Sequence, residues 1–138
     1  MSQENVDAVR QVLSGLSPDA AQERTVESFV ERLSPDVEFV EDPRFPEAAT
    51  YHGREEYLRY AREFVEQFDQ FTFAVEGLRD IPDGRVLVCL HLSGRGKGSN
   101  AEFDVRAGWV YTVRAGVVVH IRAYMDRADA LEAVGLRE

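Results

Sequence analysis

The hydrophobic pattern of this chain changes its period near Asp69, and this change constrains the fold more than any other feature. Before it, apolar residues recur at helical spacing, most clearly over residues 54–67. After it, apolar and polar residues alternate, beginning with Phe71, Phe73 and Val75, as they do along half-buried strands. Helical segments followed by a run of hairpin-connected strands predict an α+β fold.

Turn residues and capping residues divide these patterns into elements. Helices are predicted from Ser2 to about Leu16, from Asp19 to about Leu33, over 54–67, and from Asp126 to about Leu131. The strands are predicted over 37–42, 71–79, 86–92, 101–113 and 117–125. Turns or hairpin loops are predicted at 34–36, 82–84, 93–100 and 114–116, and a loop is predicted over 44–52.

Length and composition exclude several classes of protein. The 138 residues are expected to form one domain over 1–138. The 25 acidic and 16 basic side chains give a formal net charge of −9, which disfavours binding to nucleic acid or anionic membranes. No apolar run approaches the length of a membrane span. With the single cysteine Cys89 and no signal-peptide pattern at residues 1–5, a cytoplasmic location is expected.

The strand over 37–42 carries the strongest candidate for chemistry. It alternates apolar and acidic residues and stops at Pro43, which has no N–H for strand pairing. Asp42 is therefore expected at a strand end, at the wall of a cavity, where apolar surroundings would raise its pKa and make it a general base. The alternative is that Asp42 is a turn residue that only caps the following loop.

Four segments together resemble the SnoaL-like and ketosteroid-isomerase-like branch of the nuclear-transport-factor-like superfamily. They are Val-Glu-Asp-Pro at 40–43, Tyr-His-Gly-Arg-Glu at 51–55, the glycine-rich 94–99, and 121–126 followed by 130–133. The resemblance covers Asn5 to Leu136. It implies a cone-shaped α+β barrel, in which a curved, mostly antiparallel sheet wraps around a long helix and leaves one pocket. The fold hosts isomerases, cyclases, hydratases, epoxide hydrolases and binding domains, so it selects no single reaction.

The resemblance also suggests catalytic residues. It places the general-base aspartate of ketosteroid isomerase on Asp42, but the oxyanion-binding tyrosine and aspartate of that enzyme have no counterparts near Val12 or near Gly108. Arg106 is the candidate that could instead stabilise an enolate, if it points into the pocket near Asp42. The alternative is that Arg106 pairs with an acidic neighbour at the rim of the sheet.

The two faces of the predicted sheet are assigned by alternation together with the resemblance. The pocket face and the long helix are expected to supply the substrate-binding residues, namely Phe39, Tyr57, Tyr60, Phe64, Leu90, Leu92, Gly108, Val110, Ile121, Ala123 and Met125. The opposite face is expected to form a homodimer interface through His91, Trp109, Tyr111, His120, Arg122 and Tyr124.

These observations predict a pocket protein for a small hydrophobic molecule. The favoured activity is a cofactor-independent isomerase, cyclase or dehydratase acting on a hydrophobic carbonyl-containing substrate, with Asp42 as general base. A metal site is not expected, because the three histidines lack the spacing of zinc ligands. Two alternatives remain open: a non-catalytic ligand-binding module, and a dimerisation domain with a vestigial pocket.

Overall fold

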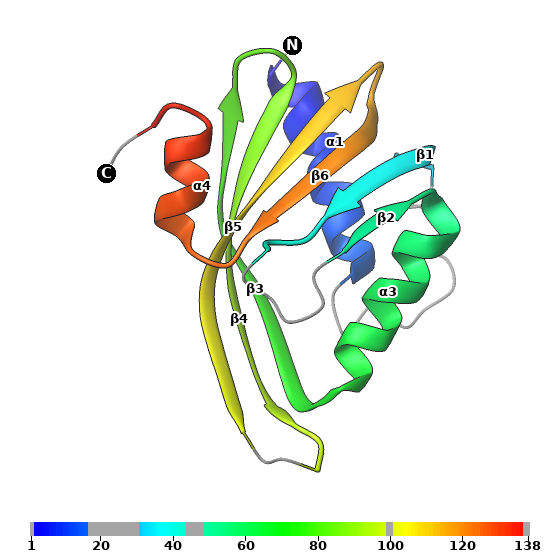
Figure 1. Cartoon of the computed structure of the whole chain (residues 1–138). Coiled ribbons are helices and arrows are strands. Elements are labelled where there is room, and N and C mark those ends of the chain that lie inside the picture. Colours follow the sequence, from blue (N-terminus) through cyan, green and yellow to red (C-terminus); the bar gives the residue numbers. More distant parts are fainter. Residues whose placement is uncertain (1, 17–30, 44–48, 99–100, 137–138) are drawn as a thin grey trace.

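The computed structural model describes residues 2–16, 31–43, 49–98 and 101–136 (Figure 1). Its helices are α1 (Ser2–Leu16), α3 (Arg54–Glu66) and α4 (Arg127–Ala133). Its strands are β1 (Leu33–Val40), β2 (Thr50–His52), β3 (Phe68–Ile81), β4 (Arg85–Gly96), β5 (Glu102–Arg114) and β6 (Val117–Tyr124).

The strands form one curved, open sheet in the order β2-β1-β6-β5-β4-β3. The pair β1 and β6 is parallel, and every other pair is antiparallel. Helices α1 and α3 pack on the concave face and α4 lies on the opposite face (Figure 1). The predicted α+β fold with a mostly antiparallel curved sheet is therefore confirmed.

Two hydrophobic cores hold the helices to the sheet. On the concave side, the helical spacing of Val9, Val12 and Leu13 puts all three in the core beneath α1. On the convex side, Ala130 and Leu131 of α4 pack against the sheet. Helix α4 begins where Asp126 caps it, because the Asp126 carboxylate accepts a hydrogen bond of 2.9 Å from the Ala128 N–H.

The first strand departs from the sequence prediction. Residues 34–36 were expected to form a turn, but they lie within β1, and Leu33 belongs to that strand rather than to a helix. The pairing of β1 with β6 is irregular between Leu33 and Glu38, and Pro35 falls in this interval, where its missing N–H interrupts no regular ladder. Glu31 and Arg32, also predicted to be helical, form a turn, and residues 19–30 of the predicted helix lie outside the described residues.

The remaining differences concern the lengths of strands. The predicted loop over 44–52 contains the short strand β2, which pairs with β1 through Phe39 and Tyr51. Strands β4 and β5 continue into the predicted hairpin loop, to Gly96 and from Glu102, and β3 begins directly after α3. Strand ends that are polar or contain glycine show little alternation, so the strands predicted from the sequence were too short.

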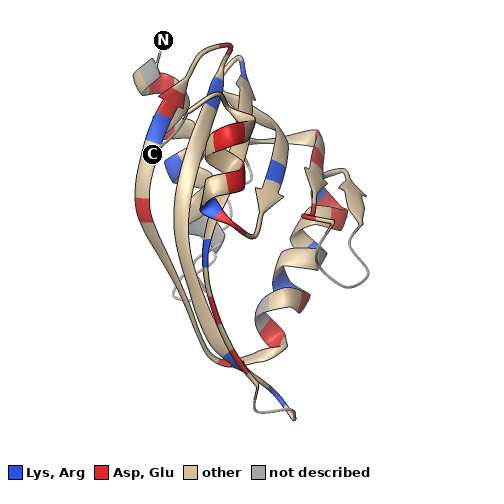
Figure 2. Cartoon of the chain, turned by 60° about the vertical axis from the view of Figure 1, so that its left-hand side comes forward, with Lys and Arg blue, Asp and Glu red and all other residues tan. Residues whose placement is uncertain are grey.

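Charged side chains are interspersed along the helices and strands (Figure 2). Helices α3 and α4 each carry both acidic and basic residues, and charged residues recur along the long strands, so the net charge of −9 is not gathered on one element. Among the helices of the described residues, none is long and apolar enough to cross a membrane.

Candidate functional site

An apolar cavity of about 60 Å³ lies between α3 and the concave face of the sheet. A single water needs about 10–15 Å³ by the same kind of measure, so the cavity has room for a small molecule. Nine of the sixteen described lining residues are aromatic: Phe39, Tyr57, Tyr60, Phe64, Phe71, Phe73, Phe103, Trp109 and Tyr124. The wall is completed by Glu41, Ala61, Leu92, Val105, Ala107, Ala123 and Met125.

The aromatic rings of the wall contact one another around Phe39. Its ring centroid lies 5.2 Å from that of Tyr57, 5.1 Å from that of Tyr60 and 6.0 Å from that of Trp109. The ring planes are inclined at 45°, 36° and 72° to that of Phe39. These are the tilted and edge-to-face arrangements that aromatic pairs prefer, so the rings support one another as a rigid wall.

Glu41 is the one carboxylate among the described residues that line the cavity. Val37 and Phe39 face the concave core, and the period of two along the strand carries Glu41 to the same face. Its Oε2 accepts a 2.6 Å hydrogen bond from the Tyr60 hydroxyl, and its Oε1 accepts one of 3.2 Å from the Ala49 N–H. Both carboxylate oxygens are therefore held in place.

The Tyr60 hydroxyl keeps its proton beside this carboxylate. Burial, the hydrogen bond to Glu41 and the negative charge of Glu41 raise the pKa of Tyr60 far above its ordinary value of 10. Tyr60 therefore remains a hydrogen-bond donor at neutral pH.

Asp42 occupies a different place from the one predicted. Its side chain is buried, at 4% exposure, but it is not among the residues that line the cavity. Its Oδ2 accepts a 2.7 Å hydrogen bond from the main-chain N–H of Met125, which does line the cavity. Asp42 thus fixes the end of β6 behind the wall, and alternation along the strand explains why its neighbour Glu41 reaches the cavity instead.

The family of this chain follows from its sequence. A family model described as a SnoaL-like domain matches residues 17–121. The chain belongs to the SnoaL-like domain family. Among curated proteins, none matches this sequence.

Solved structures share the fold of this SnoaL-like domain. An NTF2-like protein from Burkholderia thailandensis is 26% identical and has a TM-score of 0.75, with 92% of this chain and 96% of that chain covered. A protein from Jannaschia assigned as a SnoaL-like polyketide cyclase is 19% identical, with a TM-score of 0.73 and 99% and 95% covered. A protein with a ketosteroid isomerase-like fold from Catenulispora acidiphila, in complex with trimethylamine, is 18% identical, with a TM-score of 0.65 and 99% and 95% covered.

The predicted faces of β5 are wrong by one residue in this SnoaL-like domain. Val88 of β4 pairs with Trp109 of β5, and Leu90 pairs with Ala107, so even-numbered residues of β4 share a face with odd-numbered residues of β5. The prediction placed even-numbered residues of both strands on the pocket face. In this hairpin, even-numbered residues of β4 lie beside odd-numbered residues of β5. An error of one residue in the pairing therefore moves every side chain of β5 to the other face.

The correction moves residues in both directions. Gly108 and Val110, expected in the pocket, lie on the convex face beneath α4, and a Cβ built on Gly108 would lie 2.5 Å from that of Ala130. Trp109 and Tyr111, expected in a dimer interface, face the concave side, where Trp109 lines the cavity and Tyr111 is fully buried in the core.

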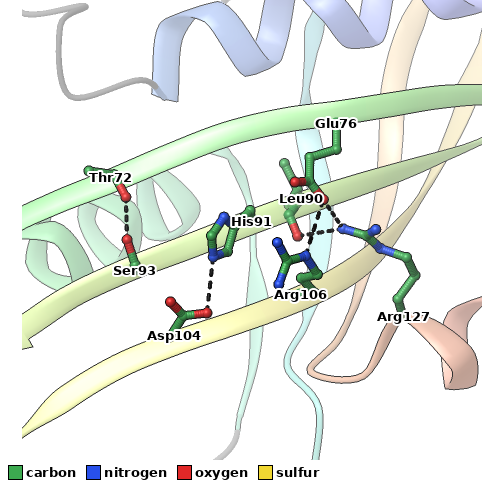
Figure 3. Close-up of polar contacts among 8 residues, drawn as sticks. All are labelled: Thr72, Glu76, Leu90, His91, Ser93, Asp104, Arg106 and Arg127. Carbon is green, nitrogen blue, oxygen red and sulfur yellow. Dashed lines mark hydrogen bonds and ion pairs between the residues drawn. The ribbon is translucent and has the colours of Figure 1, made fainter.

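Arg106 is not among the residues that line the cavity, and its side chain lies beside Glu76 and Arg127 (Figure 3). Its side chain is 61% exposed on the convex side, and its Nε lies 3.8 Å from Glu76 Oε1. Glu76 also accepts a 2.6 Å hydrogen bond from Arg127 Nη2, which lowers the pKa of Glu76. Because Arg106 and Asp42 do not meet at the cavity, the predicted catalytic pair does not form.

The histidines expected at the dimer interface lie beside carboxylates on the sheet surface. His91 Nε2 lies 3.0 Å from Asp104 Oδ1 (Figure 3). His120 Nε2 lies 3.2 Å from Glu38, which also faces His52 Nδ1 at 3.4 Å. Within the described part of the chain, no group of three or more His, Cys, Asp or Glu side chains is arranged to hold a metal ion.

Of the predicted substrate-binding residues, seven lie in the cavity wall: Phe39, Tyr57, Tyr60, Phe64, Leu92, Ala123 and Met125. Leu90 and Ile121 are fully buried in the concave core and do not line the cavity. Among the lining residues that the sequence prediction did not name, Glu41 is the one that carries a carboxylate. Alternation from Val37 and Phe39 predicts that Glu41 faces the cavity. The family resemblance instead places the general base on the next carboxylate, Asp42.

Proposed function

We propose that this SnoaL-like domain binds a small hydrophobic carbonyl compound in its aromatic cavity and that Glu41 removes a proton next to the carbonyl. This is the proton transfer of an isomerase-, cyclase- or dehydratase-type enzyme, and a carboxylate performs it without a cofactor. The observation that carries the proposal is the carboxylate of Glu41, held at both oxygens, at the wall of an otherwise apolar cavity.

The surroundings of Glu41 support a role as base. The Ala49 N–H and the Tyr60 hydroxyl fix its orientation, so a bound substrate meets a carboxylate that needs no rearrangement. Asp42 is not suited to act as the base, because it does not line the cavity and its carboxylate accepts a hydrogen bond from the Met125 N–H. Hydrogen-bond donors for a developing enolate are carried by two wall residues, Tyr57 and Trp109.

The test is exchange of the protons next to the carbonyl of a small cyclic ketone, such as cyclopentanone, in D₂O, followed by NMR. The wild-type protein should accelerate exchange above the buffer rate, and Glu41→Gln should lose about 10²–10⁴-fold of that acceleration. The matched control is Glu38→Gln, on the same strand but off the cavity. Equal acceleration by wild type and Glu41→Gln would overturn the proposed role of Glu41.

A second candidate is binding without chemistry. It is favoured by one observation: among the described residues that line the cavity, none is Lys, Arg or His, so no cationic group stands ready to stabilise an enolate. The Catenulispora protein of the same fold, at 18% identity, is in complex with trimethylamine, which supports a small-molecule ligand for this fold. In this case, the ketone would bind to the wild-type protein and its protons would exchange at the buffer rate.

A further inference from the structure

We infer that the cavity selects a small organic cation, an alkylammonium group, over a neutral molecule of the same shape. The inference rests on the proposed function only in requiring that the cavity holds a ligand. It does not require that Glu41 act as a base.

The orientation of the rings argues for a rounded group rather than a flat one. The planes of Tyr57, Tyr60 and Trp109 are inclined to Phe39 at 45°, 36° and 72°, so the wall offers ring surfaces in several directions. A flat ligand stacks best between parallel faces. A tetrahedral group such as trimethylammonium, or its uncharged counterpart tert-butyl, can contact several inclined rings at once.

Charge then distinguishes the cation from its uncharged counterpart. The faces of aromatic rings carry partial negative charge, which attracts ammonium groups, and the attraction grows when water is excluded. Glu41 adds a full negative charge at the same wall, and the described lining residues include no Lys, Arg or His to neutralise it. The Glu41 carboxylate would repel an anionic ligand.

The Glu41 carboxylate and the aromatic rings around Tyr60 are close enough to contact the same ligand group. The Tyr60 hydroxyl donates to Glu41 at 2.6 Å, while the Tyr60 ring lies 5.1 Å from Phe39 and 4.6 Å from Tyr51 between centroids. Tyr60 therefore joins the charged part of the wall to the aromatic part. An ammonium group seated on these rings would lie beside the Glu41 carboxylate.

The experiment compares choline with 3,3-dimethyl-1-butanol, which has the same shape with carbon in place of the charged nitrogen. Binding of each is measured by calorimetry and by ligand-observed NMR. The wild-type protein should bind choline about 10–100-fold more tightly than the alcohol, the range expected for a desolvated cation beside rings and a carboxylate. Equal affinity for the two probes, or binding of neither, would overturn the inference.

Variants assign the preference to its sources. Glu41→Gln should reduce the ratio of choline affinity to alcohol affinity about tenfold. Tyr60→Phe should keep most of that ratio because it keeps the ring. Glu38→Gln serves as the control for removing a carboxylate elsewhere on β1. An undiminished preference in Glu41→Gln would contradict the inference.

The same samples separate this inference from the proposed function. Exchange of the ketone protons without a preference for choline would refute the inference and leave the proton transfer intact. A preference for choline without catalysed exchange would refute the proton transfer and leave the inference intact.

Discussion

At the scale of single residues, two neighbouring carboxylates have separate tasks. Glu41 lines the cavity and holds the Tyr60 hydroxyl, whereas Asp42 is buried behind the wall on the Met125 N–H. The alternation of side chains along an extended chain assigns these tasks, because consecutive residues cannot point the same way. A substitution at either position should therefore affect a different property of the protein.

Replacing Asp42 should lower stability. Asp42→Ala leaves the Met125 N–H without its acceptor in a buried place, which costs about 1–3 kcal/mol of unfolding free energy. The measurement is urea unfolding, with Asp36→Ala, exposed on the same strand, as the control. A loss for Asp42→Ala no larger than that of the control would show that the hydrogen bond is not a structural requirement.

Two buried tyrosines and the half-buried Tyr60 predict a loss of stability in alkali. Burial raises the pKa of Tyr57, Tyr60 and Tyr111 above the ordinary value of 10, so the folded chain keeps protons that the unfolded chain releases. Their contribution is complete below pH 10 and is lost as pH rises above it, at up to about 1.4 kcal/mol per pH unit for each.

Chemical denaturation across this pH range, with tyrosinate absorbance recorded in parallel, checks this prediction. The three tyrosines should ionise only as the chain unfolds, and Tyr57→Phe should make the decline less steep. Full ionisation of every tyrosine in the folded protein near pH 10 would contradict their protected state.

At the scale of elements, the register between β4 and β5 decides which residues meet. Val88 pairs with Trp109, and this one pairing puts Trp109 into the cavity wall and Gly108 against α4. A glycine at position 108 lets the last helix approach the sheet, because a side chain would occupy the place of Ala130. The cavity and the seat of α4 are thus two consequences of the same register.

Filling position 108 should displace α4. Gly108→Val places a side chain where even a Cβ would lie 2.5 Å from that of Ala130, and such overpacking costs about 1–3 kcal/mol. Gly77→Ala is the matched control, because no atom lies within 4 Å of a Cβ built there. Thermal unfolding should separate the two variants, and equal melting temperatures would argue against the close approach of α4.

At the scale of the whole molecule, homodimerisation through the convex face remains a prediction. The predicted interface loses Trp109 and Tyr111, which face the concave side. It keeps Arg122, which is exposed on β6 with its guanidinium 5.5 Å from the Tyr124 ring centroid. Sedimentation should give a dimer for the wild type and a monomer for Arg122→Glu. Arg59→Glu on α3 should remain dimeric, and a monomeric wild type would refute the interface.

The fold could be predicted from the sequence because its signals are local. Helical spacing predicted α1 and α3, alternation and the apolar run over 86–92 predicted β3 to β6, and Asp126 marked the start of α4. Strand β2 could not be predicted, since three residues carry no period, and its pairing with β1 depends on tertiary contacts.

The site was less predictable because it depends on register. To predict which residues of β5 face the cavity, one must know that Val88 pairs with Trp109. This pairing follows from the geometry of the hairpin rather than from the periodicity of the sequence. The misplacement of Arg106 and Gly108 follows from that single unknown. Predicting the position of Glu41 requires only the alternation that begins at Val37, because Val37, Phe39 and Glu41 face the same side.

The central claim is that Glu41, and not Asp42, is the carboxylate that acts at the cavity. Its most direct test is the rate of ketone proton exchange in wild type, Glu41→Gln and Asp42→Asn, measured under conditions in which all three are folded. The account predicts that Glu41→Gln loses about 10²–10⁴-fold of the acceleration while Asp42→Asn retains most of it. Loss of exchange in Asp42→Asn with full activity in Glu41→Gln would contradict the account.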